Sequence, residues 1–412
     1  MSGEILFLAH RVPFPPNRGD KIRSHHVLRH LASLAPVHVA TFADDATDMV
    51  QDRELGAVTA SYCLIQRHKS LVRAGLEAIN YGRPISLTAF HDLALAAYVR
   101  KVLAERPVGT IYAFSGQMGQ YIPASFKGRV IFDFVDVDSA KFEAYAEAGR
   151  GPRRWLEARE GRLMRSEEAR LARRVDISLL ISNEEAALFR ARLLPRDRLE
   201  CDVRVLRNGI DSALFDRAIC DPAPAMLECS GPRLIFTGQM DYAPNVAAAQ
   251  RVIERLLPSI RQQFPQATFH VVGRSPPGAL QAQHGRGGVY VWGAVDDMRC
   301  FLAAADLALV PLELARGVQN KVLEAMAMRL PVVLTPAAAT GIGGSEHHHF
   351  AIGHDDNELV TLVCTLLSDA EHRLRLGSAA RHFVVDTLSW SATLAPLAAM
   401  LDLPDTAARD AA

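Results

Sequence analysis

The hydrophobic positions of the chain form short runs, and stretches with the spacing of amphipathic helices lie between them. In the first half these runs predict strands at Glu4–Ala9, Val37–Phe42, Tyr62–Gln66, Gly109–Phe114, Arg129–Asp136, Ile177–Ser182 and Val203–Leu206. In the second half they predict strands at Leu234–Thr237, Thr268–Val272, Val289–Trp292, Leu307–Val310 and Pro331–Leu334. Strands that alternate with helices are typical of α/β domains with a doubly wound parallel sheet.

The strand–helix rhythm restarts after a segment rich in proline, which indicates two domains. With 412 residues the chain is long enough for two cores. We expect an N-terminal Rossmann-like domain over residues 1–217 and a linker over 218–232. A second domain is expected over 233–388, and residues 389–412 are expected to form a C-terminal helix and tail that return toward the first domain.

Composition narrows the class of protein. Hydrophobic residues make up 49% of the chain, and 46 basic residues balance 46 acidic ones, so no overall field favours nucleic acid. The six cysteines show no Cys-x-x-Cys spacing, which indicates reduced thiols and no zinc site. We find no signal peptide, and no apolar run reaches the roughly 18–20 residues that span a bilayer. These features predict a cytoplasmic protein.

The segment after the predicted strand at 307–310 carries the strongest chemical pattern. Gly317 interrupts the chain, and a helix of about three turns is expected to follow. Asn320 and Lys321 would then lie in its first turn, where free N–H groups and the helix dipole favour an anion. Glu324 falls on the same flank, one turn further along. A nucleotide diphosphate with its ribose fits that arrangement.

A simpler interpretation is open for the same residues. Lys321 and Glu324 would be an exposed ion pair of little energetic value if they lay on an ordinary surface helix. The frame of strand, glycine, helix, Pro331 and strand favours the binding interpretation, because it places both charges at the carboxyl end of a parallel strand.

The pattern Asn-Lys-x-x-Glu-Ala-Met-Ala, followed by Pro-Val-Val at 331–333, resembles the nucleotide-sugar motif of GT-B glycosyltransferases of the family-4 (group 1) type. Three further segments resemble the same family: His10–Lys21, Val205–Asp211 and Phe236–Asn245. The combination is most similar to sugar transferases associated with exopolysaccharide gene clusters of the PEP-CTERM type.

This resemblance implies a fold, an activity and a set of donor-binding residues. The fold would be GT-B, with two doubly wound Rossmann-like domains facing each other across a cleft. The activity would be retaining transfer of a sugar from a nucleotide diphosphate sugar to a lipid-linked saccharide acceptor, without metal or cofactor. The donor phosphates would be bound by Gly19, Gly238, Gln239, Arg316, Asn320 and Lys321, the ribose by Glu324 and the base by Arg274 and Val295.

Two of these positions depart from the family pattern. Gln239 stands where many members have an arginine, and an amide supplies no charge to a phosphate. Arg316 stands where many members have a glutamate that holds sugar hydroxyls, and arginine is only a donor. Either Arg316 supplies the phosphate charge that Gln239 lacks, or the sugar is held differently.

The acceptor side is expected at the ends of strands in the first domain. Ser115, Asp136 and Asp138 follow predicted strands, and we assign them as catalytic candidates, with one of the aspartates orienting the acceptor hydroxyl as a general base. Asp138 and Ser139 are alternatively helix N-caps. The histidine run 347–349 lacks metal-site spacing, and we interpret it as a loop. Trp292 is assigned to the core.

The segment Arg150–Arg174 contains nine arginines and four glutamates, with Leu156, Leu163, Met164 and Leu171 on one stripe. It is either a surface helix packed on its own domain or a basic face that approaches an anionic membrane.

Two other functions stay open from sequence: a nucleotide-sugar 2-epimerase, and a catalytically idle scaffold subunit of a polysaccharide assembly complex. A nicotinamide oxidoreductase is disfavoured, because no Gly-x-Gly-x-x-Gly follows an early strand.

Overall fold

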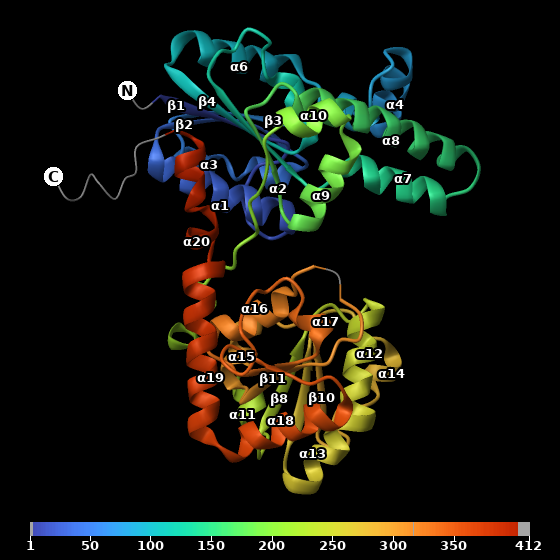
Figure 1. Cartoon of the computed structure of the whole chain (residues 1–412), viewed down its shortest axis with the longest axis vertical. Helices are drawn as coiled ribbons and strands as arrows, with labels where there is room; N and C mark the ends of the chain where they lie inside the picture. Colours follow the sequence, from blue (N-terminus) through green and yellow to red (C-terminus); the bar gives the residue numbers. More distant parts are fainter. Residues whose placement is uncertain (1–2, 316, 403–412) are drawn as a thin grey trace, which may run out of the picture. The chain divides into compact units, whose positions relative to one another are not determined.

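The computed structural model describes residues 3–315 and 317–402, which form two units, each around its own parallel sheet (Figure 1). Unit 1 contains the described residues up to Asn208 and those from Thr393 onward, and unit 2 contains the described residues from Gly209 to Ala392. Within these ranges no helix is both long enough and apolar enough to cross a membrane.

Unit 1 is built on a seven-stranded sheet in the order β3-β2-β1-β4-β5-β6-β7. Its strands are β1 (Glu4–Ala9), β2 (Val37–Ala43), β3 (Ser61–Gln66), β4 (Val108–Phe114), β5 (Arg129–Val135), β6 (Ile177–Leu180) and β7 (Val203–Val205). Its helices are α1 (Gly19–Leu34), α2 (Ala46–Met49), α3 (Asp52–Val58), α4 (Leu71–Asn80), α5 (Ile85–Ala89), α6 (Leu93–Glu105), η1 (Gly116–Tyr121), α7 (Asp138–Ala148), α8 (Gly151–Ala172), α9 (Asn183–Arg192), α10 (Pro195–Glu200) and α21 (Pro396–Met400). The short helix α20 (Trp390–Leu394) crosses the boundary between the units.

Unit 2 is built on a six-stranded sheet in the order β10-β9-β8-β11-β12-β13. Its strands are β8 (Arg233–Thr237), β9 (Thr268–Val272), β10 (Val289–Gly293), β11 (Leu307–Val310), β12 (Val332–Leu334) and β13 (Ala351–Ile352). Its helices are η2 (Arg217–Ile219), α11 (Pro224–Leu227), α12 (Ala243–Arg251), η3 (Val252–Leu256), α13 (Leu257–Gln263), α14 (Gly278–Gln281), α15 (Met298–Ala304), α16 (Asn320–Ala327), α17 (Pro336–Ala339), α18 (Asp356–Ser368), α19 (Ala370–Phe383) and η4 (Val384–Leu388).

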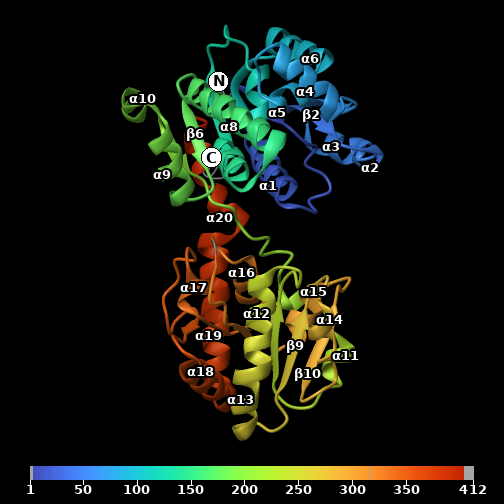
Figure 2. The same ribbon diagram turned by 90° about the vertical axis from the view of Figure 1, so that its right-hand side faces the viewer.

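The predicted doubly wound α/β architecture is confirmed in both units. The paired strands of both sheets are parallel, so each connection must cross over. Crossovers between parallel strands are right-handed, and when they run in both directions from the middle of a sheet they cover both of its faces with helices. Each predicted strand is present, with shifts of one or two residues at some ends; β13 is additional. Figure 2 shows α12 and α13 in one line, joined through the π-helical turn η3.

The boundary between the units lies earlier than predicted, at Asn208 and Gly209. Residues 218–232, interpreted as a linker, belong to unit 2, because α11 forms there and Met226 is fully buried in that unit's core. Arg381 ties the preceding segment to the same unit through a 2.6 Å bond to Asp216. The prolines of this segment indicate bends, and they led to its interpretation as a linker. The segment belongs to unit 2 because its apolar side chains are buried there.

The arginine-rich helix α8 is packed on its own unit along its apolar stripe, where Met164 and Leu171 are buried. Six of its nine segment arginines have partners within unit 1: Arg153, Arg159, Arg165, Arg170, Arg173 and Arg174. The carboxylate of buried Glu160 accepts bonds from the backbone N–H groups of Ile85 and Ser86, both at 2.8 Å. The helix therefore holds α5 in place, and most of its positive charge is used internally.

A buried ion pair joins α1 to the centre of the unit 1 sheet. Arg23 donates to both oxygens of Asp133, from Nε at 2.9 Å and from Nη2 at 3.1 Å, and both residues are at most 1% exposed. Tyr112 also donates to Asp133, at 2.8 Å, and Arg23 reaches the side chain of Asn208 at 2.8 Å. One bidentate pair thus connects a helix, two strands and the last residue before unit 2.

We expect Asp133→Ala to lower the free energy of unfolding of unit 1 by about 3–5 kcal/mol, because it leaves the Arg23 charge buried without its partner. Chemical denaturation followed by circular dichroism measures this. The matched control is Glu200→Ala, which breaks an exposed pair with Arg196 and should leave stability close to that of the wild type. Equal effects of the two changes would show that the buried pair does not anchor the unit.

Candidate functional site

The described unit 2 residues that were predicted to bind the donor gather at one edge of the unit 2 sheet. β8 and β11 lie side by side and parallel, and successive strands are added to the sheet in opposite directions on either side of them. This is the switch point where open α/β sheets bind ligands. Gly238 follows β8, and α16 with Asn320, Lys321 and Glu324 follows β11. The sheet order therefore brings together segments that are about 80 residues apart in the sequence.

Close backbone packing shapes this edge. Gly238 and Gly273 follow β8 and β9 with φ of +149° and +151°. A Cβ on Gly273 would lie 1.6 Å from the carbonyl oxygen of Gly238, so only glycine fits there. The N–H of Gly238 bonds to Val272 O at 3.0 Å, and the N–H of Gly273 bonds to Gly293 O at 2.8 Å. Three successive strand ends are thereby drawn together.

Lys321 lies directly above Gly238. A Cβ on Gly238 would be 3.0 Å from Lys321 Nζ. The ammonium also lies 4.5 Å from the centre of the Phe236 ring and donates to the side-chain oxygen of Asn245 at 2.5 Å. Asn245 in turn donates to the carbonyl of Gln239 at 2.8 Å. The half-buried ammonium of Lys321 is thus fixed beside the backbone of Gly238, where no side chain would block the approach of a ligand.

Glu324 lies one turn further along α16 and is half-buried. Burial raises its pKa to about 7, with Lys321 opposing the shift. Burial also lowers the pKa of Lys321 to about 8, and here Glu324 opposes. Among the described residues the Glu324 carboxylate accepts no hydrogen bond from a side chain or backbone group. It is an acceptor with no donor in the described part of the chain, and it lies next to a cation one turn into α16.

The remaining predicted donor residues lie along the same edge. Arg274 follows β9 and is exposed, with no side-chain partner in the described part of the chain. Val295, two residues after β10, is half-buried against the core. Gln239 is exposed, and Asn320 opens α16, which spans eight residues instead of the predicted three turns. Arg316 lies outside the described residues.

Trp292 belongs to the core, as predicted. Its ring stacks with His270 and packs edge-on against Phe301, and its N–H donates to His270 Nδ1 at 3.1 Å. A partner for the indole N–H within the protein is what a structural tryptophan needs.

Unit 1 has its own switch point, between β1 and β4. The ring of His10, which follows β1, stacks on Phe114 at the end of β4 with centres 5.8 Å apart. Its Nδ1 is buried and has no partner among the described residues, and burial lowers the pKa of the ring. Gly19 begins α1 and is exposed, with open space around its Cα. The geometry therefore leaves room for a ligand at Gly19 but does not require glycine there.

The predicted acceptor residues are brought close together at the same edge. Asp138 Oδ2 lies 3.8 Å from where a Cβ on Gly116 would be, next to Ser115, whose φ is +76°. Lys141 bonds to Asp136 at 2.5 Å and to Asp138 at 3.3 Å. Burial raises the pKa of Asp138, and Lys141 opposes the shift.

The alternative that Asp138 and Ser139 cap α7 is wrong. The cap residue is Val137, and its N–H is bonded by Glu185 at 2.8 Å. The N–H of Ser139 bonds to Glu168 at 2.9 Å. Carboxylates from distant helices therefore do the capping, which leaves Asp138 beside the edge of the sheet.

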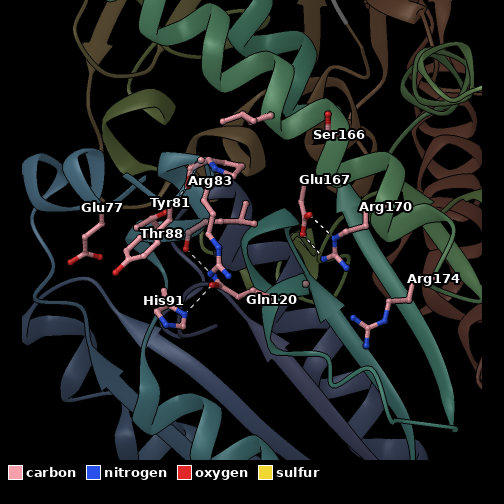
Figure 3. A pocket seen from close by; sticks show the side chains of 15 residues that line it. Glu77, Tyr81, Arg83, Thr88, His91, Gln120, Ser166, Glu167, Arg170 and Arg174 are labelled. Carbon is pink, nitrogen blue, oxygen red and sulfur yellow. Dashed lines mark hydrogen bonds and ion pairs between the residues drawn. The ribbon is translucent and has the colours of Figure 1, made fainter. Parts of the chain in front are cut away.

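Two other features lie apart from these residues. The histidines at 347–349 are not part of any metal-binding cluster of three or more ligands in the described ranges. A cavity of ≈ 990 Å³ in unit 1 lies between α8 and the α4–α5 region, and Figure 3 shows Tyr81 and Arg83 on one side of it and Arg170 and Arg174 on the other. None of the predicted site residues lines it.

Three residues of the two edges were not assigned from sequence: Phe236, Asn245 and His10. All three lie in segments that carried the family resemblance. Asn245 could have been assigned to the site from sequence, because a polar residue in the first turn of a helix can face the end of a neighbouring strand. The contact of Lys321 with Phe236 has no sequence signal, since it arises from the pairing of β8 with β11.

We expect Gly273→Ala to destabilise unit 2 and disrupt this edge, because its Cβ would overlap a backbone oxygen at a φ that alanine rarely adopts. Thermal unfolding of the purified protein measures the loss. Gly278→Ala is the matched control, since a Cβ there meets nothing within 4 Å. A wild-type unfolding temperature for Gly273→Ala would refute the close packing.

Comparisons with known proteins agree with this geometry. Residues 231–369 match the family described as Glycosyl transferases group 1. A comparison with curated protein sequences finds no match.

Several solved structures share the fold over nearly the whole chain. HepE from Anabaena in complex with UDP has a TM-score of 0.60 at 17% identity, covering 97% of this chain and 99% of that one. Sucrose-phosphate synthase from Thermosynechococcus elongatus has 0.58 at 17% identity, covering 97% and 98%. WaaG, a glycosyltransferase involved in lipopolysaccharide biosynthesis, has 0.54 at 17% identity, covering 97% and 100%. The chain therefore has the GT-B fold of two Rossmann-like domains, and residues 231–369 are similar to the group 1 glycosyl transferase family.

Proposed function

We propose that the protein is a retaining glycosyltransferase that moves a sugar from a nucleotide diphosphate sugar to a lipid-linked saccharide acceptor in exopolysaccharide biosynthesis, at the cytoplasmic face of a membrane and without a metal ion. The observation that carries the donor half of this proposal is the position of Lys321. Its ammonium is fixed over Gly238 at the switch point of unit 2, with Glu324 one turn away.

Five of the donor residues have a defined task in this proposal. Lys321 and the first N–H groups of α16 neutralise the diphosphate, and the backbone at Gly238 lets it approach closely. Glu324 accepts hydrogen bonds from the ribose. Arg274 and Val295 border the base. Because the leaving group is the nucleotide diphosphate, charge that builds on it during transfer is stabilised by groups that are already in place.

Support for the substrate classes is of two kinds. HepE was solved with UDP, with UDP and glucose, and with UDP-glucose, which makes uridine nucleotides the first probes to use. The lipid-linked acceptor and the exopolysaccharide role rest on the sequence resemblance described above. In unit 1, Asp138 and Asp136 are the proposed groups that orient the acceptor hydroxyl, with Ser115 beside them.

A ligand panel followed by product analysis tests the proposal. Thermal shift with UDP, GDP and ADP and their sugars should reveal one preferred nucleotide, since a bound ligand raises the apparent unfolding temperature. The preferred donor is then incubated with and without lipid-linked saccharides. Acceptor-dependent release of the nucleotide supports transfer, and conversion of the sugar without acceptor would establish the epimerase. Binding without turnover on any acceptor would favour the scaffold role.

We expect Glu324→Gln to weaken nucleotide binding by roughly 1–3 kcal/mol, the range for a hydrogen bond to a charged group. Calorimetric titration is done with the nucleotide and with the matching nucleotide that lacks the ribose hydroxyls. The comparison separates loss of the bond to the ribose from a general weakening of the site. The ribose-lacking analogue should bind the variant and the wild type alike. Unchanged affinity for the full nucleotide would remove Glu324 from the site.

Affinity for the nucleotide diphosphate should fall as pH rises through the pKa of Lys321, about 8. The sign follows because the lowered pKa lets the ammonium lose its charge above that pH, and the anionic ligand binds the charged form. Between about pH 7 and about pH 9 the loss should be about tenfold. Lys321→Arg keeps its charge over this range and should give a flat profile. A flat profile for the wild type would show that Lys321 does not meet the phosphates.

A further inference from the structure

The solvent-facing side of α4 in unit 1 is apolar. At 100° per residue, Val72, Leu76 and Ile79 fall on one arc of this helix and Ala74 and Ala78 on its far side, and Leu71 lies at the exposed first position. Leu71, Val72, Leu76 and Ile79 are 68%, 75%, 68% and 52% exposed, whereas Ala74 and Ala78 are fully buried. The usual polarity of a surface helix is thus reversed, with small residues packed inward and large apolar ones presented to solvent.

This helix is firmly held in its orientation. Ser70 caps it by accepting from the N–H of Arg73 at 3.3 Å. At its other end Arg159 of α8 donates to the carbonyls of Ala78 at 2.8 Å and Arg83 at 3.2 Å. Because both ends are fixed, the apolar side cannot turn inward without breaking these bonds.

The apolar surface extends beyond the helix. Tyr81 follows α4 and is 72% exposed, and Trp155 of α8 is 58% exposed one turn before Arg159, which contacts α4. We define the α4 patch as Leu71, Val72, Leu76, Ile79 and Tyr81. Five large side chains that are each more than half exposed make a surface on the order of several hundred Å², a size that usually marks an interaction site.

Charge indicates what covers the patch. Residues 67–84 contain Arg67, Lys69, Arg73 and Arg83 against the single acidic residue Glu77, whereas the whole chain has no net charge. Arg67 pairs with Asp44, outside this segment, at 2.9 Å. Lys69 and Arg73 both pair with Glu77, at 2.8 Å and 3.0 Å. Arg83 has no side-chain partner in the described ranges. Positive charge around the patch disfavours a second copy of the same surface and favours an anionic one.

We propose that the α4 patch docks on a membrane surface that carries anionic lipids. The apolar side chains enter the boundary between headgroups and acyl chains, and the cations beside them meet lipid phosphates. Tyr81 lies at the edge of the helix, where an amphipathic ring suits the interface. This proposal deepens the lipid-linked acceptor of the proposed function and rests on it. It places the contact on α4, because most arginines of Arg150–Arg174 are already used within unit 1.

Vesicle co-sedimentation of the full chain tests this placement. The probes are vesicles of phosphatidylcholine alone and of an equimolar mixture of phosphatidylcholine and phosphatidylglycerol. The wild type should bind only the mixed vesicles, and less as salt rises, since salt screens the charges. Leu76→Asp with Ile79→Asp should lower binding by about tenfold or more, because two side chains lose their burial. Arg83→Glu should weaken it without any change to the apolar surface.

The matched control is Leu199→Asp on α10. Leu199 is 90% exposed, and α10 lies on the other side of unit 1 from α4 in Figure 2. It should bind vesicles like the wild type. Thermal shift with the nucleotide is measured on every variant and should not change, because none of the proposed donor residues lies on α4, at Arg83 or on α10. A wild type that binds vesicles but no nucleotide would contradict the proposed transferase function and would still support membrane docking through the α4 patch.

Four outcomes would overturn the proposal. The first is a wild type that stays in the supernatant with mixed vesicles at low salt. The second is a wild type that binds neutral vesicles equally well. The third is an α4 double variant that binds like the wild type while replacement of Arg153, Arg154 and Arg162 by Glu abolishes binding. The fourth is a dimer in analytical ultracentrifugation that the α4 double variant dissociates, which would assign the patch to a second copy.

Discussion

The proposed donor site depends on a steric constraint between two backbones. Gly273 lies so close to Gly238 that its missing Cβ would fall 1.6 Å from a carbonyl oxygen. That contact sets the spacing of the ends of β8 and β9, and the bond from Gly273 to Gly293 carries it on to β10. With side chains excluded, the space above Gly238 is free for the ammonium of Lys321, which the N-terminal turn of α16 brings from the other side of the switch point. A close backbone approach of this kind is what a phosphate needs.

The same packing explains why Lys321 and Glu324 titrate near neutrality. Both are removed from water by their neighbours, and burial disfavours the charged form of each, which moves the two pKa values toward one another, to about 8 and about 7. Their mutual attraction does not cancel this effect. A cation and an acceptor held with incomplete solvation, and in the case of Glu324 without a hydrogen-bond donor among the described residues, gain more from an anionic ligand with hydroxyl groups than exposed side chains would.

Unit 1 distributes polar and apolar groups differently. Its interior contains the Arg23–Asp133 pair and the carboxylates of Glu160 and Glu168, all hydrogen-bonded. Its surface carries the apolar α4 patch. Charges inside are stable because each has partners, and they fix which helix lies on which part of the sheet. Large apolar side chains outside have no such compensation, and burial against a membrane would supply it.

From the sequence it was possible to predict the fold class, nearly every strand and the helix that carries Asn320, Lys321 and Glu324, because strand burial, helix period and the Asn-Lys-x-x-Glu spacing are local signals. The place of the domain boundary was predicted wrongly, since proline at 222 and 224 indicates a bend but not whether Met226 is buried beyond it. Only the tertiary structure decided that Asn245 and Phe236 hold Lys321, that Glu185 and Glu168 replace Asp138 and Ser139 as caps, and that α4 turns its large side chains outward. These outcomes depend on which strands and helices become neighbours, and contacts between residues far apart in the chain leave no mark on the pattern of either segment alone.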